Sequence, residues 1–236
     1  MNCLKIVKAL FLVPIPMVLM ILGFSIALDV NAQNTSETSN TMVARGHIMM
    51  LKDGALLVRI QTRSKAIESL KERDMEGRAE LVEQELREEN TEYAKAFVAE
   101  FDFAPVYFFR SEDSKMIKEG RLDEVVFLNS DLVPDPSIKV EQDKIYIAEF
   151  GTVAPDKSKT REGYRLEKDS AGVTQKSVYY GSTNMGFEAL VIMDDQFVQL
   201  RRPFPYYTRT YGKKGLINRK PKVAVRKMNQ KLRQFY

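Results

Sequence analysis

Cysteine, histidine and tryptophan are nearly absent from this sequence, and that scarcity limits its chemistry. The 236 residues include one cysteine, Cys3, one histidine, His47, and no tryptophan. The chain therefore has no second cysteine for an internal disulfide, and beyond residue 3 it has no thiolate nucleophile or metal ligand. A Ser-His-Asp triad would depend on His47 alone. His47 lies in an apolar stretch, where a lone histidine is more often structural than catalytic.

Common catalytic motifs are missing as well. The sequence has no Gly-x-Ser-x-Gly nucleophile elbow, no glycine-rich phosphate loop with a lysine and no dinucleotide-binding fingerprint. We therefore expect no cofactor and no metal site. Whether the protein is an enzyme stays open, and a non-enzymatic role is favoured.

The N-terminal segment predicts export. Lys5 and Lys8 precede an apolar run of 20 residues, Ala9–Leu28, and the triplet Val30–Ala32 then resembles a cleavage site. This layout is typical of a secretory signal peptide over residues 1–32. The run is also long enough to cross a bilayer, so an uncleaved N-terminal anchor is the alternative. We expect an exported protein that is periplasmic or associated with the envelope.

Acidic residues are missing from the C-terminal segment. Residues 33–200 contain 22 Lys and Arg against 31 Asp and Glu, whereas residues 201–236 contain 12 Lys and Arg and no acidic residue. Such asymmetry predicts either an anionic partner or an acidic face of the same protein against which the tail docks. The alternative, which is favoured, is that the cationic residues only solvate one face of the protein. For an exported protein the expected partner is a cell-wall polymer, an anionic lipid or an acidic protein, and no nucleic acid is expected.

Hydrophobic patterning predicts a flexible polar leader at 33–44 and a single α/β domain at 45–236. Mostly apolar stretches at 47–51 and 55–60, separated by Lys-Asp-Gly, predict a β-hairpin or a short strand that leads into a buried one. A helix pair follows, and residues 65–100 carry 11 acidic and 6 basic side chains. This pair is the expected acidic face.

The second half of the chain predicts more strands and a final helix. Residues 154–170 are polar and predict a mobile excursion, and residues 221–235 predict a basic amphipathic helix that either covers the sheet or lies on an anionic membrane. The alternation of elements predicts an α/β fold: a mixed sheet flanked by helices in a layered sandwich, reminiscent of a thioredoxin-like order with an insertion. The expected strands, of which the last two form a hairpin, are residues 105–109, 125–128, 144–150, 173–180, 189–193 and 196–200.

Three segments are candidate binding surfaces. The strongest is 201–211, where arginines and aromatic rings alternate; the residues proposed to bind are Arg201, Arg202, Tyr206, Tyr207 and Arg209. The alternative is that the rings pack on the core while the arginines pair with the acidic helices. Segment 179–186 is either a binding loop or a plain connection, and its proposed binding residues are Tyr180, Ser182 and Asn184. Residues 110–114 follow a buried strand, where α/β sheets bind ligands and where serines also cap helices.

Four sequence stretches and the basic terminal helix resemble a known group of proteins. The stretches are PVYFF (105–109), VVFLN (125–129), NMGFEAL (184–190) and QLRRPFPYY (199–207). They are similar to an uncharacterised family of exported proteins from Gram-negative bacteria. The resemblance covers most of the chain beyond residue 32 and brings no known activity. It supports export and implies that residues 199–207 matter to the fold or to a site.

These observations leave three functional hypotheses. The leading one is a non-enzymatic binding or envelope-associated protein that uses the basic-aromatic surface from Arg201 onward. A second is a hydrolase or transferase of an envelope polymer, with Asp113, Glu149 and Asp194 as candidates for carboxylate acid and base. A third is a redox-inactive thioredoxin-like adaptor.

Overall fold

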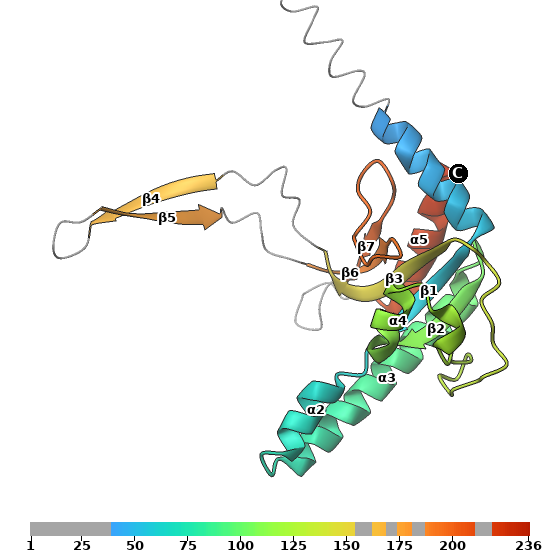
Figure 1. Cartoon of the computed structure of the whole chain (residues 1–236), viewed down its shortest axis with the longest axis horizontal. Helices are drawn as coiled ribbons and strands as arrows, with labels where there is room; N and C mark the ends of the chain where they lie inside the picture. Colours follow the sequence, from blue (N-terminus) through green and yellow to red (C-terminus); the bar gives the residue numbers. More distant parts are fainter. Residues whose placement is uncertain (1–38, 154–161, 169–173, 181–186, 211–218) are drawn as a thin grey trace, which may run out of the picture. The chain divides into compact units, whose positions relative to one another are not determined.

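The structure is a computed structural model in which five stretches of the chain are described, residues 39–153, 162–168, 174–180, 187–210 and 219–236 (Figure 1). The predicted signal peptide at 1–32 lies outside them. Contacts divide the chain into two units, Met1–Val43 and Ala44–Tyr236. Among the helices in these stretches, none combines the length and the apolar character needed to cross a bilayer.

Five strands form a mixed sheet in the order β2-β1-β3-β6-β7. β1 (Ala55–Ile60) is parallel to both of its neighbours, β2 (Val106–Arg110) and β3 (Ile145–Thr152). β6 (Glu188–Met193) is antiparallel to β3 and to the short edge strand β7 (Tyr207–Arg209). The α/β class with a mixed sheet and helices is therefore confirmed, while the thioredoxin-like order stays a prediction.

β1 is apolar along most of its length because both faces of the sheet are covered there. Leu56 and Val58 belong to one hydrophobic cluster, whereas Leu57 belongs to a second cluster on the opposite face. Strands buried on both faces have nearly continuous apolar sequences rather than alternating ones. Since β1 and β2 are parallel, the chain leaves both strands at the same edge of the sheet.

A helix, not a strand, precedes β1, so the predicted hairpin is wrong. Residues 39–53 are helical and lead directly into β1 (Figure 1). The stretch 47–51 is a continuous apolar run in sequence, but Met49 and Met50 are exposed. The helix also includes residues 39–44, which belong to the predicted leader. Its buried positions recur at the helical spacings of 4 and 3 and are Ala44, Ile48 and Leu51.

Two more helices, α3 (Glu76–Glu100) and α5 (Pro221–Phe235), pack on the same face of the sheet as the helix at 39–53. The predicted helix pair is present as α2 (Ser64–Lys71) and α3, and the predicted terminal helix is α5. α3 contributes Phe97 to the cluster on this face, and α5 contributes apolar side chains such as Met228. The apolar face of α5 is thus occupied by the protein's own core.

Short helices and loops cover the opposite face. They include α4 (Ser114–Lys118), whose Ile117 is buried in the second cluster. The strand predicted at 125–128 is not formed as such. Only Leu128 makes isolated bridges, to Phe108 and Pro134, while Val125 and Phe127 are buried against the sheet. Their apolar character comes from covering a sheet face rather than from joining the sheet.

Two further predictions for the second half need correction. A separate two-stranded sheet pairs β4 (Glu162–Lys168) with β5 (Thr174–Tyr180), although β4 lies in the polar stretch predicted to be a mobile excursion. The hairpin predicted at 189–200 is replaced by pairing of β6 with β3 and β7, leaving one isolated bridge between Met193 and Gln199. Long-range partners therefore decided the pairing of β6.

Candidate functional site

The basic-aromatic segment lies at the edge of the sheet that ends in β7. Phe204 is buried in the core, and Tyr206 and Tyr207 are half-buried against the hydrophobic clusters. The two tyrosine rings contact each other edge to face, with their centroids 4.9 Å apart. The aromatic side chains therefore hold the segment in place, as the packing alternative describes.

The arginines of the segment behave differently from its rings. Arg201, Arg202 and Arg209 are exposed, and none of them forms an ion pair with a described residue. The Arg209 guanidinium lies 4.1 Å from the centroid of the Phe187 ring, a cation–π contact. Arg202 Nη2 donates to the Tyr207 hydroxyl at 3.4 Å. Half-buried rings thus support guanidinium groups that stay in solvent.

Helix α5 adds cations beside the same rings. Lys231 Nζ donates to the Tyr207 carbonyl at 2.8 Å and lies 5.6 Å from the Tyr207 ring centroid. Burial lowers the pKa of Lys231, and the nearby cations Arg219, Lys227 and Arg202 lower it further, against an opposing effect of Tyr207. We call Arg202, Arg209, Arg219, Lys227 and Lys231 the β7–α5 basic surface.

Other cations of the tail are paired inside the protein. Arg226 forms two hydrogen bonds to the Glu100 carboxylate, at 2.6 and 2.8 Å, and Lys222 lies 3.4 Å from the same group. Arg233 pairs with Asp102 at 2.7 Å. Hydrogen bonding from Arg226 is the largest cause of the low pKa of Glu100, which is about 2. The tail therefore docks one set of cations on the end of α3 and turns another set to solvent.

Of the binding residues predicted in segment 179–186, Ser182 and Asn184 lie outside the described residues. Tyr180 is the last residue of β5.

His47, the single histidine, lies on the helix at 39–53, not on a strand. Its Nδ1 is hydrogen-bonded to the Tyr146 hydroxyl at 2.9 Å. It links this helix to β3.

The three candidate carboxylates are not joined in one cleft by any described contact. Glu149 pairs with Arg59 Nη1 at 2.9 Å on neighbouring strands. Asp194 Oδ1 accepts the backbone N–H groups of Gln196 and Val198 within its own turn. Asp113 lies after β2, where burial raises its pKa and the nearby Arg110 opposes that effect. In the described ranges, His, Cys, Asp and Glu side chains form no cluster suited to a metal ion.

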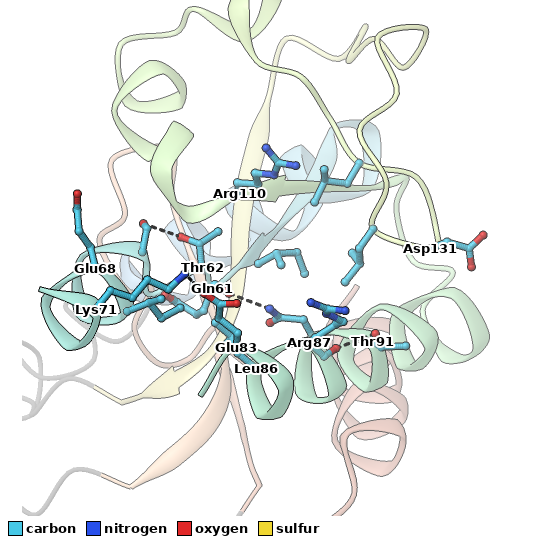
Figure 2. Close-up of a pocket in the computed structure, with 16 residues that line it drawn as sticks. Gln61, Thr62, Glu68, Lys71, Glu83, Leu86, Arg87, Thr91, Arg110 and Asp131 are labelled. Carbon is cyan, nitrogen blue, oxygen red and sulfur yellow. Dashed lines mark hydrogen bonds and ion pairs between the residues drawn. The ribbon is translucent and has the colours of Figure 1, made fainter. Parts of the chain in front are cut away.

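A pocket of about 830 Å³ lies where β1 and β2 end (Figure 2). Gln61 and Thr62 follow β1, Arg110 ends β2, and Arg87 and Asn90 come from α3. Its apolar wall includes Ile60, Ile67, Leu86, Leu128 and Leu132. Ligands of α/β proteins commonly bind beyond the carboxyl ends of parallel strands, and this volume is within the usual range for small-molecule sites.

Hydroxyl groups connect the two strand ends beside the pocket. The Thr62 backbone N–H donates to Ser111 Oγ at 3.1 Å, and the Thr62 and Ser111 hydroxyls are 2.8 Å apart. Ser114 Oγ donates to the Ser111 carbonyl at 2.6 Å. The serines of the segment 110–114 thus stabilise the turn without capping either short helix through a side chain, and Arg110 lines the pocket. Ligand binding at this segment stays a prediction.

Sequence reasoning missed most of this pocket. The carboxyl-end rule points to Arg110 and could have pointed to Gln61 and Thr62, once β1 and β2 were paired in parallel. Nothing local in the sequence marks Arg87 or Asn90, which are two polar residues among many on an acidic helix.

No protein-family model matches the chain, and neither a curated protein nor a solved structure is significantly similar to it. The resemblance to exported proteins of Gram-negative bacteria therefore stays a prediction.

Proposed function

We propose that this is an exported, non-enzymatic protein that binds an anionic component of the cell envelope through the β7–α5 basic surface. The observation that carries the proposal is a group of exposed cations beside β7 and on α5 that have no acidic partner among the described residues. Arg202, Arg209, Lys227 and Lys231 form no ion pair with a described residue, and residues 201–236 contain no Asp or Glu.

The surface suits a polyanion because its charge is concentrated. Burial is the largest cause of the lowered pKa of Lys231, and the further lowering by Arg219, Lys227 and Arg202 shows that these cations lie close to it. An anionic partner would relieve this repulsion as well as pair with each cation. Exported proteins meet such partners as cell-wall polymers, anionic lipids or acidic proteins.

The aromatic rings of Tyr207 and Phe187 fix the positions of the cations, so the surface has a defined geometry. Tyr207 is half-buried, and it positions Arg202 through its hydroxyl and Lys231 through its carbonyl. Phe187 positions Arg209 in the same way, through its ring. Side chains that are already ordered lose less conformational entropy on binding.

The test is co-sedimentation with cell-wall sacculi, with anionic liposomes and with neutral liposomes, at low and high salt. The protein is purified from cells that express the whole chain, and a triple variant, Arg202→Ala, Arg209→Ala and Lys227→Ala, is compared with it. Each Lys or Arg near an anionic bilayer contributes about 1 kcal/mol, so the triple variant should bind on the order of 100-fold more weakly. Neutral liposomes measure any contribution of the apolar N-terminal segment.

A second triple variant, Lys65→Ala, Arg73→Ala and Lys95→Ala, is the matched control. It removes the same charge from exposed positions of the α2–α3 region, outside the basic surface. The proposal predicts wild-type binding by the control and salt-sensitive binding that the first variant loses. Equal loss of binding in both variants would show that binding depends on net charge and not on the β7–α5 basic surface, which would contradict the proposal. Absence of binding to any anionic material at low salt would also refute it.

A further inference from the structure

The pocket at the ends of β1 and β2 carries two arginines that the fold does not use. Arg87 comes from α3 and Arg110 from β2, and both are exposed side chains that line the pocket. Neither guanidinium forms an ion pair or a hydrogen bond with a described residue. Figure 2 shows them on different walls of the pocket.

The acidic residues that line the pocket form no ion pair with these arginines. Glu83 is occupied by Lys71, whose Nζ lies 2.8 Å from its carboxylate. Glu68 and Asp131 lie at opposite ends of the pocket, and in Figure 2 their carboxylates point away from its centre. The first turn of α2 contains no acidic residue, so the partial positive charge of its N-terminus is also unopposed.

Asn90, in the pocket wall, has a buried acceptor atom without a described hydrogen-bond partner. Its side chain is 7% exposed, and Nδ2 donates to the Gln61 carbonyl at 2.8 Å. The Asn90 Oδ1 atom is buried and has no hydrogen-bond partner among the described residues. Buried polar atoms are nearly always paired, so this acceptor without a partner is an unusual feature of the pocket wall.

The rest of the lining is suited to a hydroxylated molecule. Gln61, Thr62, Ser64 and Thr91 offer amide and hydroxyl groups around the apolar wall. Side chains of this kind hold sugars and similar compounds through several modest hydrogen bonds, while guanidinium groups bind a carboxylate or phosphate.

We propose that this pocket binds a small hydroxylated organic anion of sugar size, with its carboxylate or phosphate held by Arg87 and Arg110. The hydroxyl groups of the ligand then meet the polar side chains at the end of β1. This site is separate from the β7–α5 basic surface and does not depend on its function.

The test is titration calorimetry with four probes: glucuronate, glucose 6-phosphate, glucose and inorganic phosphate. The protein is purified from cells that express the whole chain. At least one of the two sugar anions should bind at least tenfold more tightly than glucose and than inorganic phosphate. The identity of the tighter anion distinguishes a carboxylate ligand from a phosphate ligand.

Two variants complete the experiment. Because a hydrogen bond to a charged group contributes about 1.5–3 kcal/mol, Arg87→Ala and Arg110→Ala should each weaken sugar-anion binding roughly 10-fold to 100-fold. Both side chains are exposed, so circular dichroism should show an intact fold. A double variant, Arg73→Ala and Lys95→Ala, controls for net charge and should bind as the wild type does.

Three results would overturn the proposal. They are failure of both sugar anions to bind at millimolar concentration, binding of inorganic phosphate as tight as that of the sugar anions, and unchanged binding in both single-arginine variants.

Discussion

Gly54 is the position where the structure predicts the sharpest response to one added methyl group. It joins the helix at 39–53 to β1 and is buried. A Cβ placed there would lie 2.3 Å from the Lys144 carbonyl oxygen and 2.6 Å from the Met50 carbonyl oxygen. Both atoms belong to the backbone, and the Lys144 oxygen also accepts the Ala55 N–H at 2.9 Å. A shift that relieves the contact therefore disturbs the start of the β1–β3 pairing.

The size of the effect follows from this geometry. Overpacking in a dense core costs about 1–3 kcal/mol, and a clash with two backbone carbonyls belongs at the upper end of that range. With a urea m-value of roughly 2 kcal/mol/M, Gly54→Ala should lower the unfolding midpoint by roughly 1–1.5 M. Urea denaturation followed by circular dichroism measures this shift directly.

Gly46→Ala is the matched control on the same helix. A Cβ at Gly46 meets no atom within 4 Å, so only helix propensity changes. Alanine should then stabilise the helix by about 0.5–1 kcal/mol. If Gly54→Ala unfolds at the same urea concentration as the wild type, the close approach of residue 54 to the chain before β3 is refuted.

Three more substitutions test the packing of α3 and α5. Phe97→Ala should cost about 3–5 kcal/mol, measured by urea denaturation, because Phe97 is 1% exposed at the centre of the core and its removal leaves a cavity. Asn229 Oδ1 accepts the Phe103 N–H at 3.1 Å, so Asn229→Ala should destabilise by about 1–3 kcal/mol, and an unchanged midpoint would contradict that link. Hydrogen bonding from Arg226 lowers the pKa of Glu100 from 4.5 to about 2, so the stability that ionised Glu100 contributes is present above pH 4.5 and is lost as the pH falls toward 2. Glu100→Gln should therefore be less stable than the wild type at neutral pH, and the gap in thermal midpoint should narrow between pH 4.5 and 2.

Local periodicity was enough to find the elements whose pattern is strong. α3, α5 and the strands β1, β2 and β3 were predicted close to their observed positions. The helices have apolar residues at helical spacing, and the strands are short, mainly apolar runs. The pattern failed at residues 47–51, where exposed methionines between the buried positions hid the helical spacing. It failed again at 125–128, where apolar residues cover the sheet without joining it.

The sequence by itself determined the α/β class, the scarcity of residues for thiol or histidine chemistry, and a tail that is wholly basic. These properties follow from composition and from short-range periodicity. It also predicts an export signal, which lies outside the described residues.

Only the tertiary structure decided how the tail divides its charge, and where a pocket forms. Arg226 and Glu100 are 126 residues apart in the chain, yet they pair, while Arg209 remains in solvent beside Phe187. Arg87 and Arg110 come to one pocket because β1 and β2 are parallel and α3 lies between them in the chain. Such neighbours are set by how the helices and strands pack together. A pattern within one segment of sequence does not specify which distant segments it will contact.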